Sequence, residues 1–292
     1  MKIFIINITF IIVCSVSSCA VHRQNSIAVY PQLESDYQST GILEERFHKC
    51  SSDGPSSKRM YVYLPRNYYQ TTRSYPVVYL LHGAGGNENT WIAKGDILHI
   101  VDSLTRRGVI DECIIVVPNV NQYDDDLDYA HSRLKGVTET FFDLDGTVET
   151  AFVTDVVETV DSLYRTVADK EHRAIASLSI GGMQTIYITA SNPDVFGYVG
   201  LFSPMIHKVV KKSHASGIYD DLDIKFANQF TSPPELYWMM VGRRDIFYGQ
   251  IIGFGERMKK KGYAHEKFIS SGGHDWNNWR DYFCMFIKRL WK

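Results

Sequence analysis

Six short apolar runs of strand length recur along the chain and limit its possible folds more than any other feature. They are rich in β-branched and aromatic residues, as strands are. Helical patterns lie between them, the clearest being apolar residues at three- and four-residue spacing from Phe152 to Val167. This alternation predicts an α/β fold with a mixed, mostly parallel sheet and helices on both faces. The six runs are 59–65, 75–83, 113–119, 172–178, 198–203 and 235–242.

Length and charge narrow the class of protein further. The chain has 292 residues and a formal net charge of -2. A single α/β domain can reach about 250 residues, so the length does not require two domains. Phosphate binding needs a concentrated basic face, whereas the lysines here are scattered, so we expect no nucleic-acid partner.

The first nineteen residues differ in kind from the rest. Lys2 precedes an apolar stretch, residues 3–13, that is too short to span a bilayer. The sequence VSSC that ends at Cys19 resembles the lipobox of a bacterial lipoprotein, which implies cleavage before Cys19 and lipid attachment to it. The alternative is an ordinary secretory signal, and both predict an exported protein. The predicted segments are a signal at 1–19, a polar tether at 20–40 and a folded domain at 41–292.

Export permits disulfides, but only Cys50, Cys113 and Cys284 follow Cys19. Cys113 opens an apolar run and Cys284 lies on the apolar face of a predicted helix. We therefore expect both to be buried thiols. A disulfide that involves Cys50 stays open.

The stretch SLSIGG places Ser179 between a predicted strand and a predicted helix. In α/β sheets, ligands bind beyond the carboxyl ends of the strands. A nucleophilic serine on such a turn needs small residues two positions before and two after it, and Ser177 and Gly181 occupy these positions. The usual first residue of this pattern is glycine, and a small-residue turn is also common without any catalytic role.

A glycine-rich stretch, HGAGG at 82–86, directly follows another predicted strand. It lacks the Lys-Ser or Lys-Thr pair that a phosphate-binding loop would carry next. We therefore expect backbone N–H groups of Ala84 and Gly85, together with that of Ile180, to stabilise an oxyanion. Each such donor is worth roughly 3 kcal/mol.

A serine nucleophile needs a base, and the base needs an orienting carboxylate. Asp245 lies in a loop after the run LYWMM, and His274 lies in the loop SSGGHDW just before the last predicted helix. The order Ser, Asp, His fits such a triad. Asp275 is the alternative carboxylate, but side chains of adjacent residues usually diverge, so Asp245 is preferred.

Other ionisable residues fit the site less well. Asp194 and Asp220 lie less clearly at the end of a predicted strand than Asp245 does. His82 is expected to support the backbone of the glycine-rich loop. His207 and His214 lie in a polar segment and are expected to be solvated. The sequence has no HExxH pattern and no cysteine pair at metal-ligand spacing, so we expect no metal.

Four segments together resemble the esterase family of α/β-hydrolases that includes esterase D, feruloyl esterases, acetyl xylan esterases of carbohydrate esterase family one, and mycolyltransferases. These segments are HGAGGNENTW, the stretch from 155 to 185, VGRRD and GGHDWNNW, and the resemblance extends from about residue 40 to 292. It implies an α/β-hydrolase fold and roles for six residues. These are Ser179 as nucleophile, Asp245 as acid, His274 as base, and amides near Ala84, Gly85 and Ile180 as oxyanion donors.

The resemblance also implies an activity. It implies hydrolysis of a carboxylic ester through an acyl-enzyme without a metal or organic cofactor, with feruloyl or acetyl groups of plant-polysaccharide fragments as the acyl part. Trp276 is expected to line the substrate pocket, or else to belong to the core. The polar stretch 121–136 is expected to cover the site. An acyltransferase, or a lipid-anchored carbohydrate-binding homologue without activity, remains open.

Overall fold

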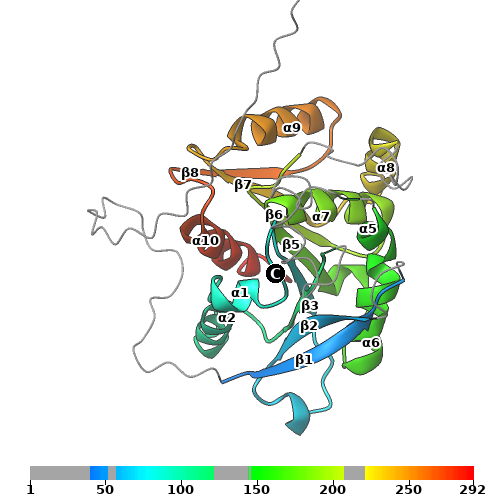
Figure 1. The fold of residues 1–292 in the computed structure, drawn as a ribbon, viewed down its shortest axis with the longest axis vertical. Coiled ribbons are helices and arrows are strands. Elements are labelled where there is room, and N and C mark those ends of the chain that lie inside the picture. Colours follow the sequence, from blue (N-terminus) through cyan, green and yellow to red (C-terminus); the bar gives the residue numbers. More distant parts are fainter. Residues whose placement is uncertain (1–39, 52–56, 122–143, 145, 207–220) are drawn as a thin grey trace, which may run out of the picture.

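The computed structural model describes residues 40–51, 57–121, 144, 146–206 and 221–292 (Figure 1). Several predictions concern residues outside these ranges. They are the signal segment with Cys19, the tether up to residue 39, residues 122–136 of the polar stretch, Asp220, His207 and His214. Within the described ranges, none of the helices has the length and apolar character needed to cross a membrane.

In the described part of the chain, eight strands form one sheet at the centre of the domain (Figure 1). Their bounds are β1 Ile42–Lys49, β2 Ser57–Leu64, β3 Val77–Leu81, β4 Ile114–Pro118, β5 Arg173–Leu178, β6 Tyr198–Phe202, β7 Leu236–Gly242 and β8 Glu266–Ser270. The order across the sheet is β1-β2-β4-β3-β5-β6-β7-β8. Strand β2 is antiparallel to both of its neighbours, and the six strands β3 to β8 are parallel to one another. The mixed, mostly parallel sheet predicted from the sequence is therefore present.

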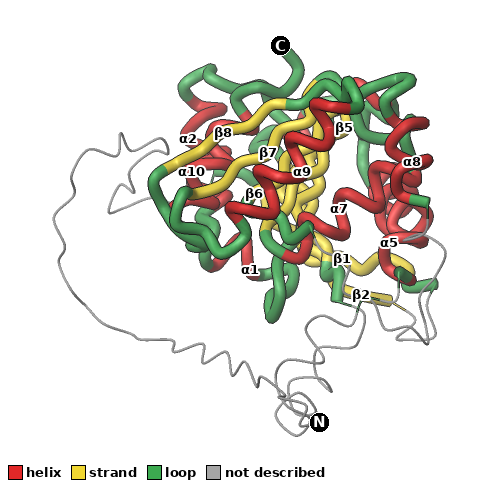
Figure 2. The backbone as a smooth tube through the Cα atoms, turned by 90° about the horizontal axis from the view of Figure 1, so that it is seen from above, coloured by secondary structure: helices red, strands yellow, loops and turns green. Residues whose placement is uncertain are grey.

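The helices surround the sheet on both sides (Figure 2). The longer ones have the bounds α2 Ile97–Arg106, α7 Ile180–Ser191, α8 Leu222–Gln229, α9 Tyr248–Lys260 and α10 Trp276–Ile287. Residues 147–163 form one helical stretch of α5 Thr147–Phe152, a π-helical turn Val153–Val157 and α6 Glu158–Leu163. A short helix, α1, spans Thr90–Ala93.

Two hydrophobic cores hold these layers together. Side chains of α2 and α10 pack on one face of the sheet, and those of the 147–163 stretch, α7 and α9 pack on the other. Strands β3 to β7 are buried at every position, as expected for strands covered on both faces. The carboxyl ends of β5 to β8 therefore meet at one edge of a rigid scaffold.

Strand β1 was not predicted from the sequence. It is an edge strand in which exposed residues alternate with partly buried ones, and the side chain of Phe47 is 56% exposed. An edge strand with one solvated face needs few apolar residues, so its sequence, ILEERFHK, carries only a weak strand signal.

The apolar pattern from Phe152 to Val167 predicts one continuous helix, but the helix in the structure ends before Val167. The helix ends at Leu163, which is 51% exposed, and Tyr164 is extended. The N–H of Val167 donates to the carbonyl of Tyr75 at 2.9 Å, just before β3. Backbone pairing with the sheet therefore replaces the last predicted helical turn.

Candidate active site

Ser179 occupies the turn between β5 and α7 in a conformation that non-glycine residues rarely adopt, with φ 55° and ψ -122°. Its N–H donates to the carbonyl of Phe202 at 3.1 Å. Its own carbonyl accepts from the N–H groups of Met205 at 2.8 Å and Gly182 at 3.0 Å. Strain of this kind persists only where the surrounding structure fixes it, which points to a functional position.

The turn leaves no room for larger residues at two of the following positions. A Cβ atom added to Gly181 would lie 2.2 Å from the carbonyl oxygen of His82, and one added to Gly182 would lie 2.4 Å from Cβ of Pro204. Glycine at these positions therefore lets α7 approach the neighbouring loops closely.

The imidazole of His274 lies between the other two predicted triad residues. Its Nε2 is 3.1 Å from Oγ of Ser179, a residue 95 positions earlier in the chain. Its Nδ1 is 3.2 Å from Oδ1 and 3.1 Å from Oδ2 of Asp245. The structure thus brings Ser179, Asp245 and His274 into one hydrogen-bonded row.

Asp245 is held as a carboxylate. Burial alone would raise the pKa of this side chain, but the hydrogen bond from His274 and that from the Phe247 N–H, at 2.8 Å, outweigh it and place the pKa below its ordinary value. A carboxylate can only accept hydrogen bonds, so Nδ1 of His274 carries the proton. In the neutral imidazole with this tautomer, Nε2 carries no proton and can accept the hydrogen bond of the Ser179 hydroxyl.

Two aromatic rings flank the imidazole. The ring centroid of Phe247 is 5.1 Å from that of His274 and that of Trp279 is 4.9 Å away, both at 90°. Such edge-to-face contacts are favourable and restrict rotation of the imidazole. Sequence reasoning missed both residues, because a single aromatic residue next to a predicted catalytic loop carries no distinctive signal.

The other candidate carboxylate, Asp275, has a structural role. It is the N-cap of α10, and its Oδ1 accepts from the N–H groups of Asn277 at 3.0 Å and Asn278 at 3.2 Å. N-capping stabilises a helix and fixes where it begins. Asp194, the third described candidate, is exposed.

The predicted oxyanion loop packs directly against the nucleophile. A Cβ atom added to Gly83 would lie 3.1 Å from Cβ of Ser179, and the Gly86 N–H closes a tight turn on the Gly83 carbonyl at 3.1 Å. Ala84 and Gly85, at the tip of this turn, are exposed. Ile180 is the first residue of α7, where the backbone N–H has no partner within the helix.

Polar side chains fix this loop to the rest of the sheet. Nε2 of His82 accepts from the Val120 N–H at 3.1 Å, and Nδ1 of His82 donates to the Gly83 carbonyl at 2.9 Å. The side chain of Glu88 accepts from Nδ2 of Asn119 at 3.1 Å and lies 3.4 Å from Nε of Arg59. His82 therefore supports the loop backbone, as the sequence predicted.

Trp276 is partly buried on the first turn of α10. Its ring centroid lies 5.1 Å from that of Trp91 and 5.1 Å from that of Trp279, with both pairs in T-shaped contact. These contacts attach its indole to the core, so its role in a substrate pocket remains a prediction.

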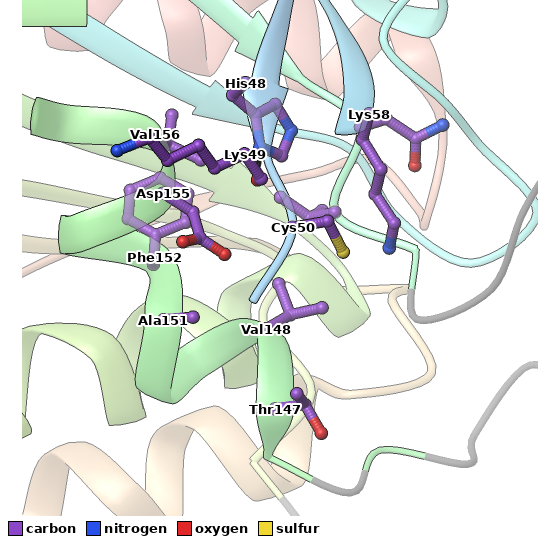
Figure 3. A pocket seen from close by; sticks show the side chains of 12 residues that line it. His48, Lys49, Cys50, Lys58, Thr147, Val148, Ala151, Phe152, Asp155 and Val156 are labelled. Carbon is purple, nitrogen blue, oxygen red and sulfur yellow. Dashed lines mark hydrogen bonds between the residues drawn. The ribbon is translucent and has the colours of Figure 1, made fainter. Parts of the chain in front are cut away.

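A separate cavity lies between the end of β1, the start of β2 and the 147–163 stretch (Figure 3). Asp155, on its wall, accepts from the N–H of Ser51 at 2.7 Å and from its hydroxyl at 2.5 Å. The volume of this cavity, about 20 Å³, is enough for about one water molecule and too small for an organic ligand.

The described cysteines agree with the sequence expectation where it is tested. Cys113 and Cys284 are buried thiols, and burial raises the pKa of Cys113 to about 12. Cys50 is half-buried and, among the described cysteines, forms no disulfide. No group of three metal-ligating side chains occurs in the described part of the chain.

A mostly parallel eight-stranded sheet, a strained serine on the turn after β5 and a histidine–aspartate pair from later loops define an α/β-hydrolase. The chain belongs to the family described as "Putative esterase", whose model matches residues 51–289. It is thus a member of a family of esterases.

Two curated relatives are similar in sequence. An endo-1,4-beta-xylanase/feruloyl esterase of Xylanibacter ruminicola is 32% identical over 237 residues, which cover 79% of this chain and 29% of the relative. Endo-1,4-beta-xylanase Y of Acetivibrio thermocellus is 28% identical over 161 residues, which cover 51% of this chain and 13% of the relative. The chain therefore spans less than a third of the length of either relative.

Solved structures share the fold. A ferulic acid esterase from the anaerobic fungus Anaeromyces mucronatus superposes with a TM-score of 0.69 at 22% identity, covering 90% of this chain and 94% of that chain. An S-formylglutathione hydrolase of Staphylococcus aureus gives a TM-score of 0.60 at 15% identity, covering 85% and 98%. At these identities the likeness concerns the fold alone.

Proposed function

We propose that this protein is a serine esterase in which Ser179 is the nucleophile, His274 the general base and Asp245 the residue that orients the base. The observation that carries the proposal is the continuous hydrogen-bonded row from Ser179 Oγ through the imidazole to Asp245. A serine hydroxyl is a weak nucleophile near neutral pH, and an adjacent base oriented by a third group activates it.

The proposed reaction has two halves. In the first, Nε2 of His274 takes the Ser179 proton while Oγ attacks the ester carbonyl, and the alcohol then leaves with that proton as the acyl-enzyme forms. In the second, water gives a proton to His274 and attacks the acyl-enzyme. His274 then returns this proton to Oγ of Ser179 as the acid leaves. The reaction needs no metal or organic cofactor.

The proposed oxyanion donors are the backbone N–H groups of Ala84, Gly85 and Ile180. Two features support them: Ile180 is the first residue of the helix that starts beside the nucleophile, and the 83–86 turn packs against Ser179. Donors held in place before the reaction stabilise the charge that develops on the carbonyl oxygen.

The proposed substrates are feruloyl or acetyl esters of plant-polysaccharide fragments. The name of the Xylanibacter relative, which includes feruloyl esterase, supports this choice.

We further propose that the protein is exported and attached to a membrane through lipid on Cys19, with residues 20–40 as tether and 41–292 as the catalytic domain. The support is the short apolar stretch and the VSSC sequence at the N-terminus. Metabolic labelling with a palmitate analogue, compared between the wild type and Cys19→Ala, tests the anchor. Equal labelling of both proteins would contradict it.

Hydrolysis assays with methyl ferulate, acetylated xylan and p-nitrophenyl acetate test the activity and the acyl group. We expect Ser179→Ala to lower kcat by at least about 10⁴-fold and to abolish labelling by a fluorophosphonate, while near-wild-type thermal unfolding shows that the fold is intact. Activity retained in Ser179→Ala would contradict the proposal. Acyl transfer to an added sugar in preference to water would reveal an acyltransferase instead.

A further inference from the structure

The loop that carries His274 contains two consecutive glycines, Gly272 and Gly273, immediately before the histidine. Glycine has the largest conformational freedom of any residue, so such a loop does not by itself hold a side chain in one place. The row from Ser179 to Asp245 nevertheless requires the imidazole to keep both of its hydrogen bonds. Some contact outside the row must therefore restrain this backbone.

Asn278, on the first turn of α10, makes that contact. Its Nδ2 donates to the carbonyl of Gly273, the residue before His274, at 2.5 Å. Its Oδ1 accepts from the hydroxyl of Ser270 at 3.0 Å. The residue is 8% exposed, so water competes little for these bonds. One side chain thus joins the end of β8 to the backbone next to the histidine.

The orientation of the Asn278 amide is fixed by its partners. The Gly273 carbonyl can only accept, so it must face the NH₂ group, and Oδ1 must then face Ser270. Because Ser270 donates its one proton to Asn278, it accepts from the hydroxyl of Tyr282, 2.6 Å away. The three side chains therefore form a chain of donors that ends on the Gly273 carbonyl.

Steric contacts leave this loop little freedom to move around Asn278. A Cβ atom added to Gly272 would lie 2.2 Å from Nδ2 of Asn278, and one added to Gly242 would lie 2.0 Å from the Gly272 carbonyl oxygen. The N–H of Arg244 also donates to that carbonyl at 3.0 Å. The loop that carries His274 is therefore attached to the loop that carries Asp245.

We propose that Asn278 is a positioning residue for His274: by holding the Gly273 carbonyl, it keeps the imidazole within hydrogen-bonding reach of both Ser179 and Asp245. The inference rests on the proposed function, because it assigns Asn278 a role in the same triad. Asn278 contacts neither Ser179 nor the Asp245 carboxylate through a hydrogen bond of its own. Its effect on the reaction passes through the backbone of the loop.

Two substitutions test the role, with the preceding residue as a matched control. Asn278→Ala removes both hydrogen bonds, and Asn278→Asp keeps the shape but replaces the donor that faces Gly273. Asn277→Ala changes an exposed neighbour on the same turn. We expect kcat to fall about 10- to 100-fold in both Asn278 variants, as small misplacements of catalytic groups do, with KM within about 2-fold of the wild type. Asn277→Ala should match the wild type.

A spectroscopic measurement separates positioning from mere stability. An imidazole N–H held by a carboxylate gives a strongly downfield proton resonance, and we expect the His274 Nδ1 proton to lose this signal or broaden in the Asn278 variants at a temperature where circular dichroism shows them folded. Ser270→Ala keeps the bond to Gly273, so its loss of kcat should be smaller. Because both residues act through one chain, Ser270→Ala combined with Asn278→Ala should be no worse than Asn278→Ala alone.

The outcomes distinguish this inference from the proposed function. Wild-type kcat and an unchanged downfield resonance in folded Asn278→Asp would overturn the role of Asn278, even if Ser179→Ala is inactive. If Ser179→Ala keeps its activity, the proposed function fails. The resonance, which needs no turnover, then still decides whether Asn278 positions the imidazole. Should Asn278→Ala not fold, the kinetics and the resonance of Asn278→Asp decide the question.

Discussion

The hydroxyl of Thr185, on α7, donates a hydrogen bond at 2.8 Å to Oγ of Ser177, which lies on β5 just before the turn that presents Ser179. Both residues are completely buried. Ser177 stands where glycine is usual in this type of turn, and its side chain is accommodated because it points to α7 and finds a partner there. The departure from the usual pattern is therefore compensated by a local polar contact.

Ser177→Ala should lower the free energy of unfolding by about 1–3 kcal/mol, because it leaves the buried Thr185 hydroxyl without this acceptor. Replacing both partners, as Ser177→Ala with Thr185→Val, should recover part of the loss, since no polar group then lacks its partner. Urea unfolding of the wild type and the two variants measures both differences. A single variant as stable as the wild type would refute this account of the turn.

The stability of the protein should depend on the ionisation of Asp245. The pKa of Asp245 in the folded protein lies below its ordinary value of 3.8, so the carboxylate stabilises the fold fully above pH 3.8, and this contribution is lost as the pH falls through the lower folded-state pKa. The difference in free energy of unfolding between the wild type and Asp245→Asn should therefore shrink on acidification. Urea unfolding between about pH 3 and pH 7 measures it.

Ser179→Ala is the control for this experiment. It leaves the contacts of Asp245 with His274 and the Phe247 N–H in place, so it should keep the wild-type pH dependence of stability. A difference between wild type and Asp245→Asn that stays constant with pH would show that the carboxylate is not stabilised as described.

Gly181→Ala should both destabilise the protein and inactivate it. The new methyl group would lie 2.2 Å from the carbonyl oxygen of His82. Its position is fixed by the backbone of α7 and the carbonyl is itself backbone, so relief requires moving α7 or the glycine-rich loop. We expect a loss of about 1–3 kcal/mol or more, measured by thermal unfolding, together with reduced fluorophosphonate labelling of Ser179.

Gly249→Ala provides the matched control. Gly249 is a residue of α9 that is not buried, and a Cβ atom added there meets nothing within 4 Å. Alanine should stabilise the helix by about 0.5–1 kcal/mol, without any effect on turnover. Equal effects of the two substitutions would contradict the close approach of α7 to the loop.

Glu88→Gln should reduce turnover more than substrate binding. Glu88 is 3% exposed and connects the end of the oxyanion loop to Asn119 and Arg59. Removing its charge weakens this attachment and displaces the proposed N–H donors of the oxyanion, so we expect kcat to fall about 10-fold with little change in KM. Glu45→Gln is the control, because Glu45 is 4.0 Å from the same arginine but largely exposed. Similar kinetics of the two variants would argue against the anchoring role.

Much of the fold was readable from local patterns. Strands β3 to β7 occur where apolar runs predict them, because strands buried on both faces need continuous apolar sequence. Strand β2 also lies at a predicted run, although exposed and buried residues alternate in its first half. Strand β1 escaped prediction since one of its faces is solvated, and the helical stripe was extended to Val167 because periodicity does not register the competing hydrogen bond to Tyr75. The residue types of a segment indicate whether it is buried, whereas hydrogen bonds between backbone groups distant in the chain leave no pattern in the sequence.

The candidate site was likewise predictable from the sequence only in part. The sequence alone determined which residue types follow the strands, and so nominated Ser179, Asp245 and His274 in the order Ser, Asp, His. Only the tertiary structure decided that Asp245 meets the imidazole while Asp275 caps a helix, that Phe247 and Trp279 flank the ring, and that Asn278 and Glu88 hold the two loops. These contacts join residues that are distant in the chain or that point in directions set by packing, and spacing along a sequence carries no information on either.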